Sequence, residues 1–225
     1  MDYQPRPGIH SKKKRRDRLI RLAEQHPEWV LGFGDEVWWS RLALPAVRTW
    51  QASDTPLRLV EQETPKEDAD PKALACYGLL ARIRTSTSET PVDKILLRFV
   101  DGRPVSTVSI DFLSWCSERL HTAGKKALLL VWDNASWHIS KAVRSWLGEH
   151  NRQVKAGKRV GVRIVLCLLP SKSPWLNAIE PKWVHGKRAV VEPARLLTAK
   201  ELADRACAYF DCEHEPHLVQ PKKAA

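Results

Sequence analysis

The sequence predicts an α/β fold in which helices cover a central β-sheet. Apolar runs at residues 29–35, 127–132 and 162–169 have the length and continuity of buried strands. Segments with apolar residues at helical spacing lie between these runs. The chain has 225 residues, 43 % of them hydrophobic, which is enough for the core of one domain.

The first elements follow from charge and apolar pattern. Residues 1–28 are expected to form a basic arm that ends in a short helix. A strand should begin at Trp29 and reach the acidic pair Asp35 and Glu36, with a hairpin partner at residues 38–44.

The same criteria place the remaining elements. Up to Gly124, these are a loop at 53–71, a strand at 73–83, a hairpin of strands 95–100 and 104–108 turning at Asp101-Gly102, and a helix from 110 to Gly124. The strand at 127–132 follows, then a helix capped by Ser140 that ends near His150, and a basic surface loop at 151–163. The last elements are the strand at 162–169, a helix starting at Ser173-Pro174, and a helix at 198–209. The main domain should span residues 29–212, and residues 213–225 should form a loose tail.

The charge balance indicates the kind of partner. With 37 Lys and Arg against 26 Asp and Glu, the net charge of +11 favours polyanions, with nucleic acid the first choice and an anionic membrane the second. A basic protein without such a partner is the alternative. No apolar run approaches the ~20 residues of a membrane span, and no secretory signal is present, so we expect a cytoplasmic protein.

Five cysteines, an odd number without a C-x-x-C pair, argue against a disulfide framework. Cys207, Cys212, His214 and His217 lie close together in the sequence. Their spacing fits no standard zinc pattern, so reduced cysteines are the simpler interpretation.

Acidic residues follow the buried runs. Asp35 and Asp133 each close an apolar run, and Glu180 lies on the helix expected after a third. Sites in open α/β sheets gather at the carboxyl ends of strands, so the three carboxylates could meet. Three unpaired carboxylates repel one another, and divalent cations remove that cost. The alternative is that these acids cap helices or pair with arginines.

Three sequence motifs resemble those of mariner-type transposases, in the bacterial insertion-sequence 630 branch. The first runs from Gly34-Asp35-Glu36 to Arg48-Thr49-Trp50, and the second is Asp133-Asn134-Ala135-Ser136-Trp137-His138. The third extends from Leu169-Pro170 through Asn177-Ala178-Ile179-Glu180 to Trp183. The family usually has proline where this chain has Ala178.

This resemblance implies a ribonuclease H-like fold with a mixed central sheet flanked by helices. It also implies a DNA transposase that cleaves transposon ends and joins the freed 3′-hydroxyl to target DNA. Asp35, Asp133 and Glu180 would be the catalytic residues and the ligands of two Mg²⁺ or Mn²⁺ ions. A homodimer in a synaptic complex is expected on the same ground.

Other positions in these motifs could support the site. Strand alternation points Glu36 to the face opposite Asp35, so it ranks second as a ligand. Asn134 matches a motif position, and His138 could order the metal shell, contact a phosphate, or only hydrogen-bond within its loop. Asn177 could hold the loop before Glu180 or contact DNA.

Basic residues near the expected site are candidates for phosphate contacts, namely Lys155, Lys158, Arg159, Lys182, Lys187 and Arg188. Only 28 residues precede the first strand, too few for the helix-turn-helix units of this family. We therefore expect a bacterial catalytic domain that lacks them and could work with an upstream helix-turn-helix half. A catalytically inactive DNA-binding remnant and a nuclease that only hydrolyses are the alternatives.

Overall fold

The computed structural model describes residues 9–42, 65–84, 90–171, 173–191 and 195–220. Its elements are α1 (Ile9–Gln25), β1 (Trp29–Ser40), β2 (Ala73–Ile83), β3 (Val92–Asp101), α2 (Ser106–Thr122), β4 (Ala127–Trp132), α3 (Lys141–Lys155), β5 (Arg163–Leu168), the 3₁₀ turn η1 (Pro174–Leu176), α4 (Glu180–Val190), α5 (Ala199–Tyr209) and β6 (Leu218–Val219).

The strands form one mixed six-stranded sheet in the order β5-β4-β1-β2-β3-β6. The β1–β2 and β2–β3 pairs are antiparallel, whereas β1, β4 and β5 run parallel. The fully buried sequence of β4 agrees with its place between two parallel neighbours. The sheet therefore brings β1 and β4, which are about 100 residues apart in sequence, side by side.

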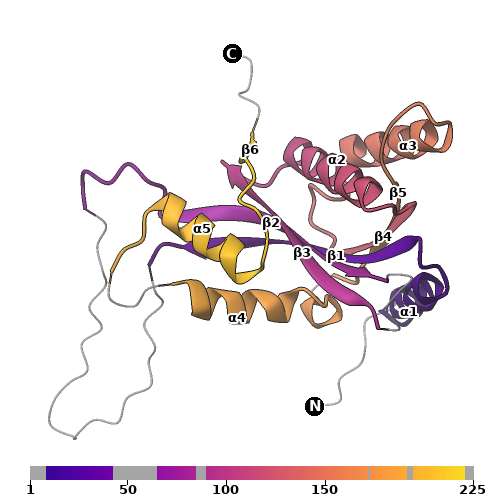
Figure 1. Ribbon diagram of the computed structural model, residues 1–225, viewed down its shortest axis with the longest axis horizontal. Helices are drawn as coiled ribbons and strands as arrows, with labels where there is room; N and C mark the ends of the chain where they lie inside the picture. The colour runs from indigo at the N-terminus through magenta and orange to yellow at the C-terminus, as the bar shows by residue number, and fades with distance from the viewer. Residues whose placement is uncertain (1–8, 43–64, 85–89, 172, 192–194, 221–225) are drawn as a thin grey trace, which may run out of the picture.

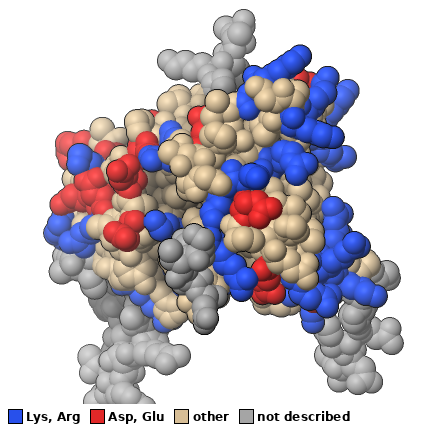
Figure 2. Space-filling view, turned by 45° about the vertical axis from the view of Figure 1, so that its right-hand side comes forward, with Lys and Arg blue, Asp and Glu red and all other residues tan. Residues whose placement is uncertain are grey.

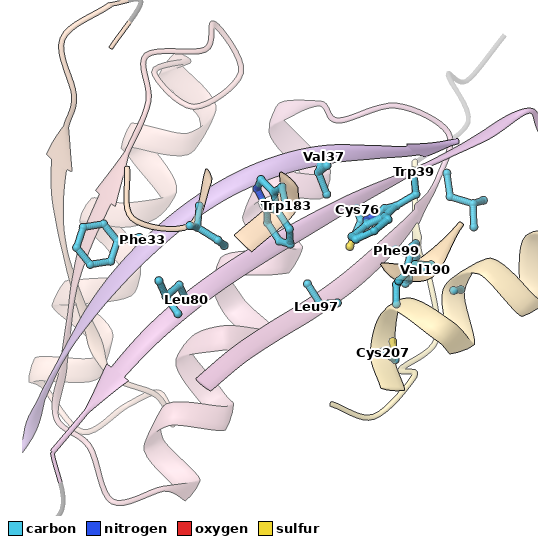
Figure 3. Close-up of a cluster of buried hydrophobic side chains, with 14 of the residues drawn as sticks. Phe33, Val37, Trp39, Cys76, Leu80, Leu97, Phe99, Trp183, Val190 and Cys207 are labelled. Atoms are coloured by element: carbon cyan, nitrogen blue, oxygen red, sulfur yellow. The ribbon is translucent and has the colours of Figure 1, made fainter. Parts of the chain in front are cut away.

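Helices cover both faces of the sheet (Figure 1). One face packs against α1, α4 and α5, where Trp183, Leu202 and Cys207 meet side chains of β1 and β2. Figure 3 shows part of this cluster, with Trp183 lying over the strands between Val37 and Leu80. The other face packs against α2 and α3. This three-layer arrangement confirms the predicted mixed sheet flanked by helices.

Two predicted hairpins are wrong. Trp38 and Ser40 continue β1 instead of forming a return strand, and the antiparallel partner of β1 is β2. The Asp101-Gly102 turn leads from β3 into α2, so residues 106–108 are helical. Gly102 has φ of +115°, as a sharp turn requires, but a turn alone does not determine whether a strand or a helix comes next.

The helices after β4 also differ from prediction. α3 begins after its cap Ser140, as expected, but continues to Lys155. Most of the first half of the predicted basic loop 151–163 is therefore helical, and Gly157 lies in the turn after the helix. The helix expected from Ser173 is interrupted, because η1 ends at Leu176 and α4 begins only at Glu180.

The C-terminal region is more ordered than the expected loose tail. Leu218 and Val219 form β6, which pairs with Val100 and Asp101 of β3. Most of the predicted loop 53–71 lies outside the described residues. Within the described part of the chain, no helix has both the length and the apolar character needed to cross a membrane.

Candidate active site

The parallel strands β1 and β4 both lead to predicted acids. Phe33 pairs with Val131, and both side chains belong to the core cluster on the α4 face. Two residues further along each strand stand Asp35 and Asp133. Since neighbouring strands are about 4.8 Å apart, extending this register by two residues would bring Asp35 and Asp133 to neighbouring positions at the carboxyl ends of the two strands.

Trp183 fixes the orientation of Asp35. Its indole Nε1 donates to Oδ2 of Asp35 over 2.9 Å, and Asp35 is only 9 % exposed. The indole can approach the sheet because Gly78, the β2 partner of Asp35, has no side chain. A Cβ atom at Gly78 would overlap the ring of Trp183. Trp183 could be found through its sequence motif, whereas Gly78 was missed because its role depends on register.

The break between η1 and α4 positions Glu180. Asn177 lies in this break, and its Nδ2 donates to the carbonyl of Gly34 over 2.9 Å. This bond ties the segment before α4 to the β1 residue adjacent to Asp35. Glu180 then begins α4, and Pro181 takes a position where no backbone N–H is needed. Of the two roles considered for Asn177, the structure supports that of holding the loop.

A cavity of about 290 Å³ opens beside two of the acids. Asp133, Asn134, Ser173, Asn177 and Glu180 are among its lining residues, whereas Asp35 is not. The Oγ of Ser173 and the Oδ1 of Asn177 are buried without a partner among the described residues. Buried polar atoms are normally satisfied, so these two oxygens are available to water or to another polar group in the cavity.

Glu180 interacts electrostatically with each of the other two predicted acids. The pKa of Asp35 is raised to about 7, mainly by burial and to a smaller extent by the negative charges of Glu180 and Glu36. Burial and the charge of Asp133 raise the pKa of Glu180, against the opposing charge of Lys187. Asp35 and Asp133 are thus each coupled electrostatically to Glu180, as a site built from the three acids would require.

His138 connects Asp133 to Glu36. Its Nδ1 lies 2.6 Å from Oδ1 of Asp133, its Nε2 lies 2.5 Å from Oε1 of Glu36, and the ring is fully buried, stacked on Trp132. Burial opposes protonation, but the hydrogen bonds and charges of the two carboxylates outweigh it and raise the pKa of His138. A protonated ring would donate to both acids.

The pKa values of the two acids bonded to His138 are shifted in opposite directions. Burial acts to raise the pKa of Asp133, but the hydrogen bonds from His138 and from the backbone N–H of Ala135 outweigh it, and the net shift is downward. Glu36 lies on the opposite face from Asp35, as strand alternation predicts, and burial raises its pKa. His138 therefore contacts one carboxylate oxygen of Asp133 from within the loop that follows β4.

The oxygen-only donor set suits a hard divalent cation such as Mg²⁺ or Mn²⁺. A cation would remove the mutual repulsion that raises the pKa values of Asp35 and Glu180, and the two unpartnered oxygens of the cavity could bind its water ligands. In the described residues, however, no three His, Cys, Asp or Glu side chains already surround one point as a ligand set. The chemistry fits, and ion binding would require the carboxylates to adjust.

The predicted phosphate-contact residues are dispersed. Lys155 and Lys158 are exposed at the end of α3, but Arg159 is tied to Ser114 and lies over the ring of Trp146. On α4, Lys187 and Arg188 are exposed, and Lys182 is exposed beside a cavity between β3 and the end of α5.

A larger basic surface surrounds α1, α3 and β5, where Figure 2 shows many Lys and Arg side chains. We call this the basic face. Its exposed members are Lys12, Lys13, Lys14, Arg15, Arg18, Arg152, Lys155, Lys158 and Arg163.

Comparison with protein families gives a match over part of the chain. Residues 94–203 match the model of the DDE superfamily endonucleases. The matched region, just under half of the chain, contains Asp133, His138 and Glu180, but it begins after Asp35. No curated protein sequence matches the chain.

The chain is similar in fold to solved structures of Mos1 transposase. A paired-end complex with the left transposon end has a TM-score of 0.61 at 12 % identity, covering 94 % of this chain and 57 % of that one. A Mos1 mariner paired-end complex with Mn has a TM-score of 0.59 at 12 % identity, and the match covers 95 % of this chain and 57 % of that one. The isolated catalytic domain of Mos1 mariner transposase has a TM-score of 0.50 at 12 % identity, and the match covers 95 % of this chain and 86 % of that one.

These likenesses establish the fold. The mixed sheet flanked by helices is ribonuclease H-like, as in the Mos1 catalytic domain, which confirms the fold implied by the sequence resemblance. The chain spans about 57 % of the length of the longer Mos1 transposase chains that it matches.

Proposed function

We propose that this chain is the catalytic domain of a metal-dependent DNA transposase of the bacterial insertion-sequence 630 type. The observation that carries the proposal is the electrostatic coupling of Glu180 to both Asp35 and Asp133. The endonuclease family match at residues 94–203 and the ribonuclease H-like fold support it. The protein would work in the cytoplasm of a bacterium.

In this proposal the three acids bind two Mg²⁺ or Mn²⁺ ions. Such ions, when bound, activate an oxygen nucleophile and stabilise the leaving oxygen in phosphodiester cleavage and strand transfer. Trp183 and His138 each hold one carboxylate oxygen, of Asp35 and Asp133 respectively, and so limit how these ligands can turn. Asn177 holds the start of α4, and with it Glu180, against β1.

The DNA substrates in this proposal are transposon ends and a target duplex. The basic face would contact phosphates, which position the duplex without reading its sequence. Trp175 is 67 % exposed in η1, beside the acidic cavity, where it could stack on an unpaired base. A synaptic homodimer and an upstream helix-turn-helix half are the proposed partners for pairing and recognising ends.

The test is an assay that separates cleavage from joining. The full chain, alone and with the upstream half, is incubated with Mn²⁺, target DNA, and labelled DNA carrying the inverted repeats that flank its gene. Joined products are expected from the wild type. Nicked products without joining would instead establish the hydrolytic nuclease.

A matched pair of variants tests the acids. Asp133→Ala should remove nearly all cleavage while DNA binding is retained, whereas Asp111→Ala, which removes an exposed acid of α2, should leave cleavage intact. If Asp133→Ala leaves every measurable activity of the chain unchanged, the DNA-binding remnant is the correct interpretation.

A further inference from the structure

Two histidines face each other outside the acidic cluster. They lie in the segment between α5 and β6, and their Nε2 atoms are 3.2 Å apart. The Nδ1 of His214 lies 2.6 Å from Oδ1 of Asp204 on α5. The Nδ1 of His217 lies 2.6 Å from Oδ1 of Asp101 at the end of β3. The two rings thus stand between two carboxylates from different elements.

The carboxylates determine which nitrogens carry hydrogen. An ionised carboxylate can only accept, so the Nδ1 of each ring must be the donor. Each neutral imidazole then has a lone pair on Nε2, and the 3.2 Å between the Nε2 atoms of His214 and His217 brings these lone pairs close together. Such an arrangement is repulsive unless a cation, either a proton or a metal ion, lies between the two nitrogens.

The distances suit a metal ion. Zinc binds histidine nitrogen at about 2.0–2.1 Å in tetrahedral geometry, which places two nitrogen ligands about 3.3 Å apart. The observed 3.2 Å agrees with this value within the tolerance expected of a metal site. A carboxylate on the far nitrogen of each histidine is also the usual outer support of a zinc ligand.

The surroundings leave the position between the rings accessible. The side chains of His214 and His217 are 25 % and 23 % exposed, and both rings pack beside Phe99. Two cations lie near the pair but are bonded to other groups, Lys200 to the second oxygen of Asp204 and Arg98 to the carbonyl of Pro216.

The neighbouring cysteines do not contribute. The thiols of Cys207 and Cys212 interact with each other, and Cys207 is buried in the core on the α4 face. Sequence spacing grouped these cysteines with the histidines, but the fold separates the two pairs. With no third described residue placed to complete the ligand set, water or another molecule must supply the remaining ligands.

We propose that His214 and His217 form a two-histidine site for Zn²⁺ or a similar nitrogen-preferring transition metal, with Asp204 and Asp101 as outer supports. The ion would join the C-terminal segment to both α5 and the end of β3, next to the pairing of β6. This site is chemically distinct from the acidic cluster, whose oxygen ligands suit Mg²⁺ or Mn²⁺.

Zinc titration of the full chain by calorimetry tests the site, after metal has been removed with a chelator. The titration uses an Asp133→Asn background, so that zinc bound at the acidic cluster is reduced. One ion per chain is expected. His214→Gln or His217→Gln should weaken binding more than tenfold, and Asp101→Asn should weaken it about ten- to a hundredfold through the lost support.

Two controls make the result decisive. His121→Gln alters an exposed histidine at the end of α2, and Cys212→Ser removes the most accessible thiol, and neither should change the titration. Far-UV circular dichroism checks that each variant remains folded. The proposal is overturned if the chain binds no zinc, if both histidine variants bind it unchanged, or if Cys212→Ser abolishes binding.

Discussion

Asp35 illustrates how a buried site residue reduces stability in the absence of metal. Its pKa is raised from 3.8 to about 7, so the folded state holds a proton that the unfolded chain releases at lower pH. Stability should therefore fall as pH rises from about 4 to about 7 and then level off. The full shift corresponds to at most about 4 kcal/mol.

The first prediction follows from this pH dependence. Without divalent ions, Asp35→Asn should be more stable than the wild type at pH 8, and the difference should vanish near pH 4. Mg²⁺ at pH 8 should stabilise the wild type but not the variant. Urea unfolding at the two pH values measures both effects, and a wild type as stable at pH 8 as Asp35→Asn would contradict the burial argument.

The bridge through His138 supports a second prediction. His138→Ala leaves Glu36 buried without its partner, which should cost about 3–5 kcal/mol of unfolding free energy. Adding Glu36→Gln to that variant removes the uncompensated charge and should restore part of the loss. A double-mutant cycle by chemical denaturation measures this coupling, and additive effects of the two substitutions would show that the two residues act independently.

Sequence patterns indicated the acids but not their connections. Asp35, Asp133 and Glu180 could be chosen because each follows an apolar run within a motif. The bonds from Trp183 to Asp35 and from His138 to Glu36 join residues more than 100 positions apart. Such bonds depend on strand register and on the interrupted start of α4, which local patterns do not encode.

At the scale of elements, the position of α4 on the sheet depends on one glycine. Gly78→Ala should displace Trp183 and destabilise the fold by about 1–3 kcal/mol, as overpacking does. Gly148→Ala is the matched control, because Gly148 lies within α3 with open space around it. This control should be neutral or stabilise by up to about 1 kcal/mol. Equal effects of the two substitutions in urea unfolding would contradict the packing argument.

The elements that could be predicted from the sequence are those marked by a continuous apolar run or by a capping residue. The buried run of β4 and the Ser140 cap of α3 were predicted correctly, because burial on both faces and capping leave clear patterns. The two hairpins were wrong because the partner of a strand is chosen by tertiary packing. Thus β1 continues past Asp35 and Glu36 as one strand of twelve residues.

At the scale of the whole molecule, the net charge of +11 is distributed unevenly. DNA affinity should fall steeply with salt if the basic face binds phosphates. Reversing charge there with Lys155→Glu or Arg163→Glu should weaken binding to all sequences alike and reduce the salt slope by about one for each phosphate interaction removed. Fluorescence anisotropy over a range of salt concentrations measures both quantities.

A distant lysine provides the control for that experiment. Lys66 is exposed in the turn before β2, near the end of β1 that lies away from α1 (Figure 1). Lys66→Glu changes the net charge by the same amount and should affect DNA affinity less. Equal losses of affinity from the two positions would mean that overall charge, and not a defined face, governs binding.

A crystal structure of the chain with Mn²⁺, with the metal located by anomalous scattering, would show whether the three acids form a metal site. We expect manganese to be bound among the carboxylate oxygens of Asp35, Asp133 and Glu180, with Asp133 still hydrogen-bonded to His138. Manganese bound elsewhere, or carboxylates that remain apart at saturating Mn²⁺, would contradict the proposed convergence.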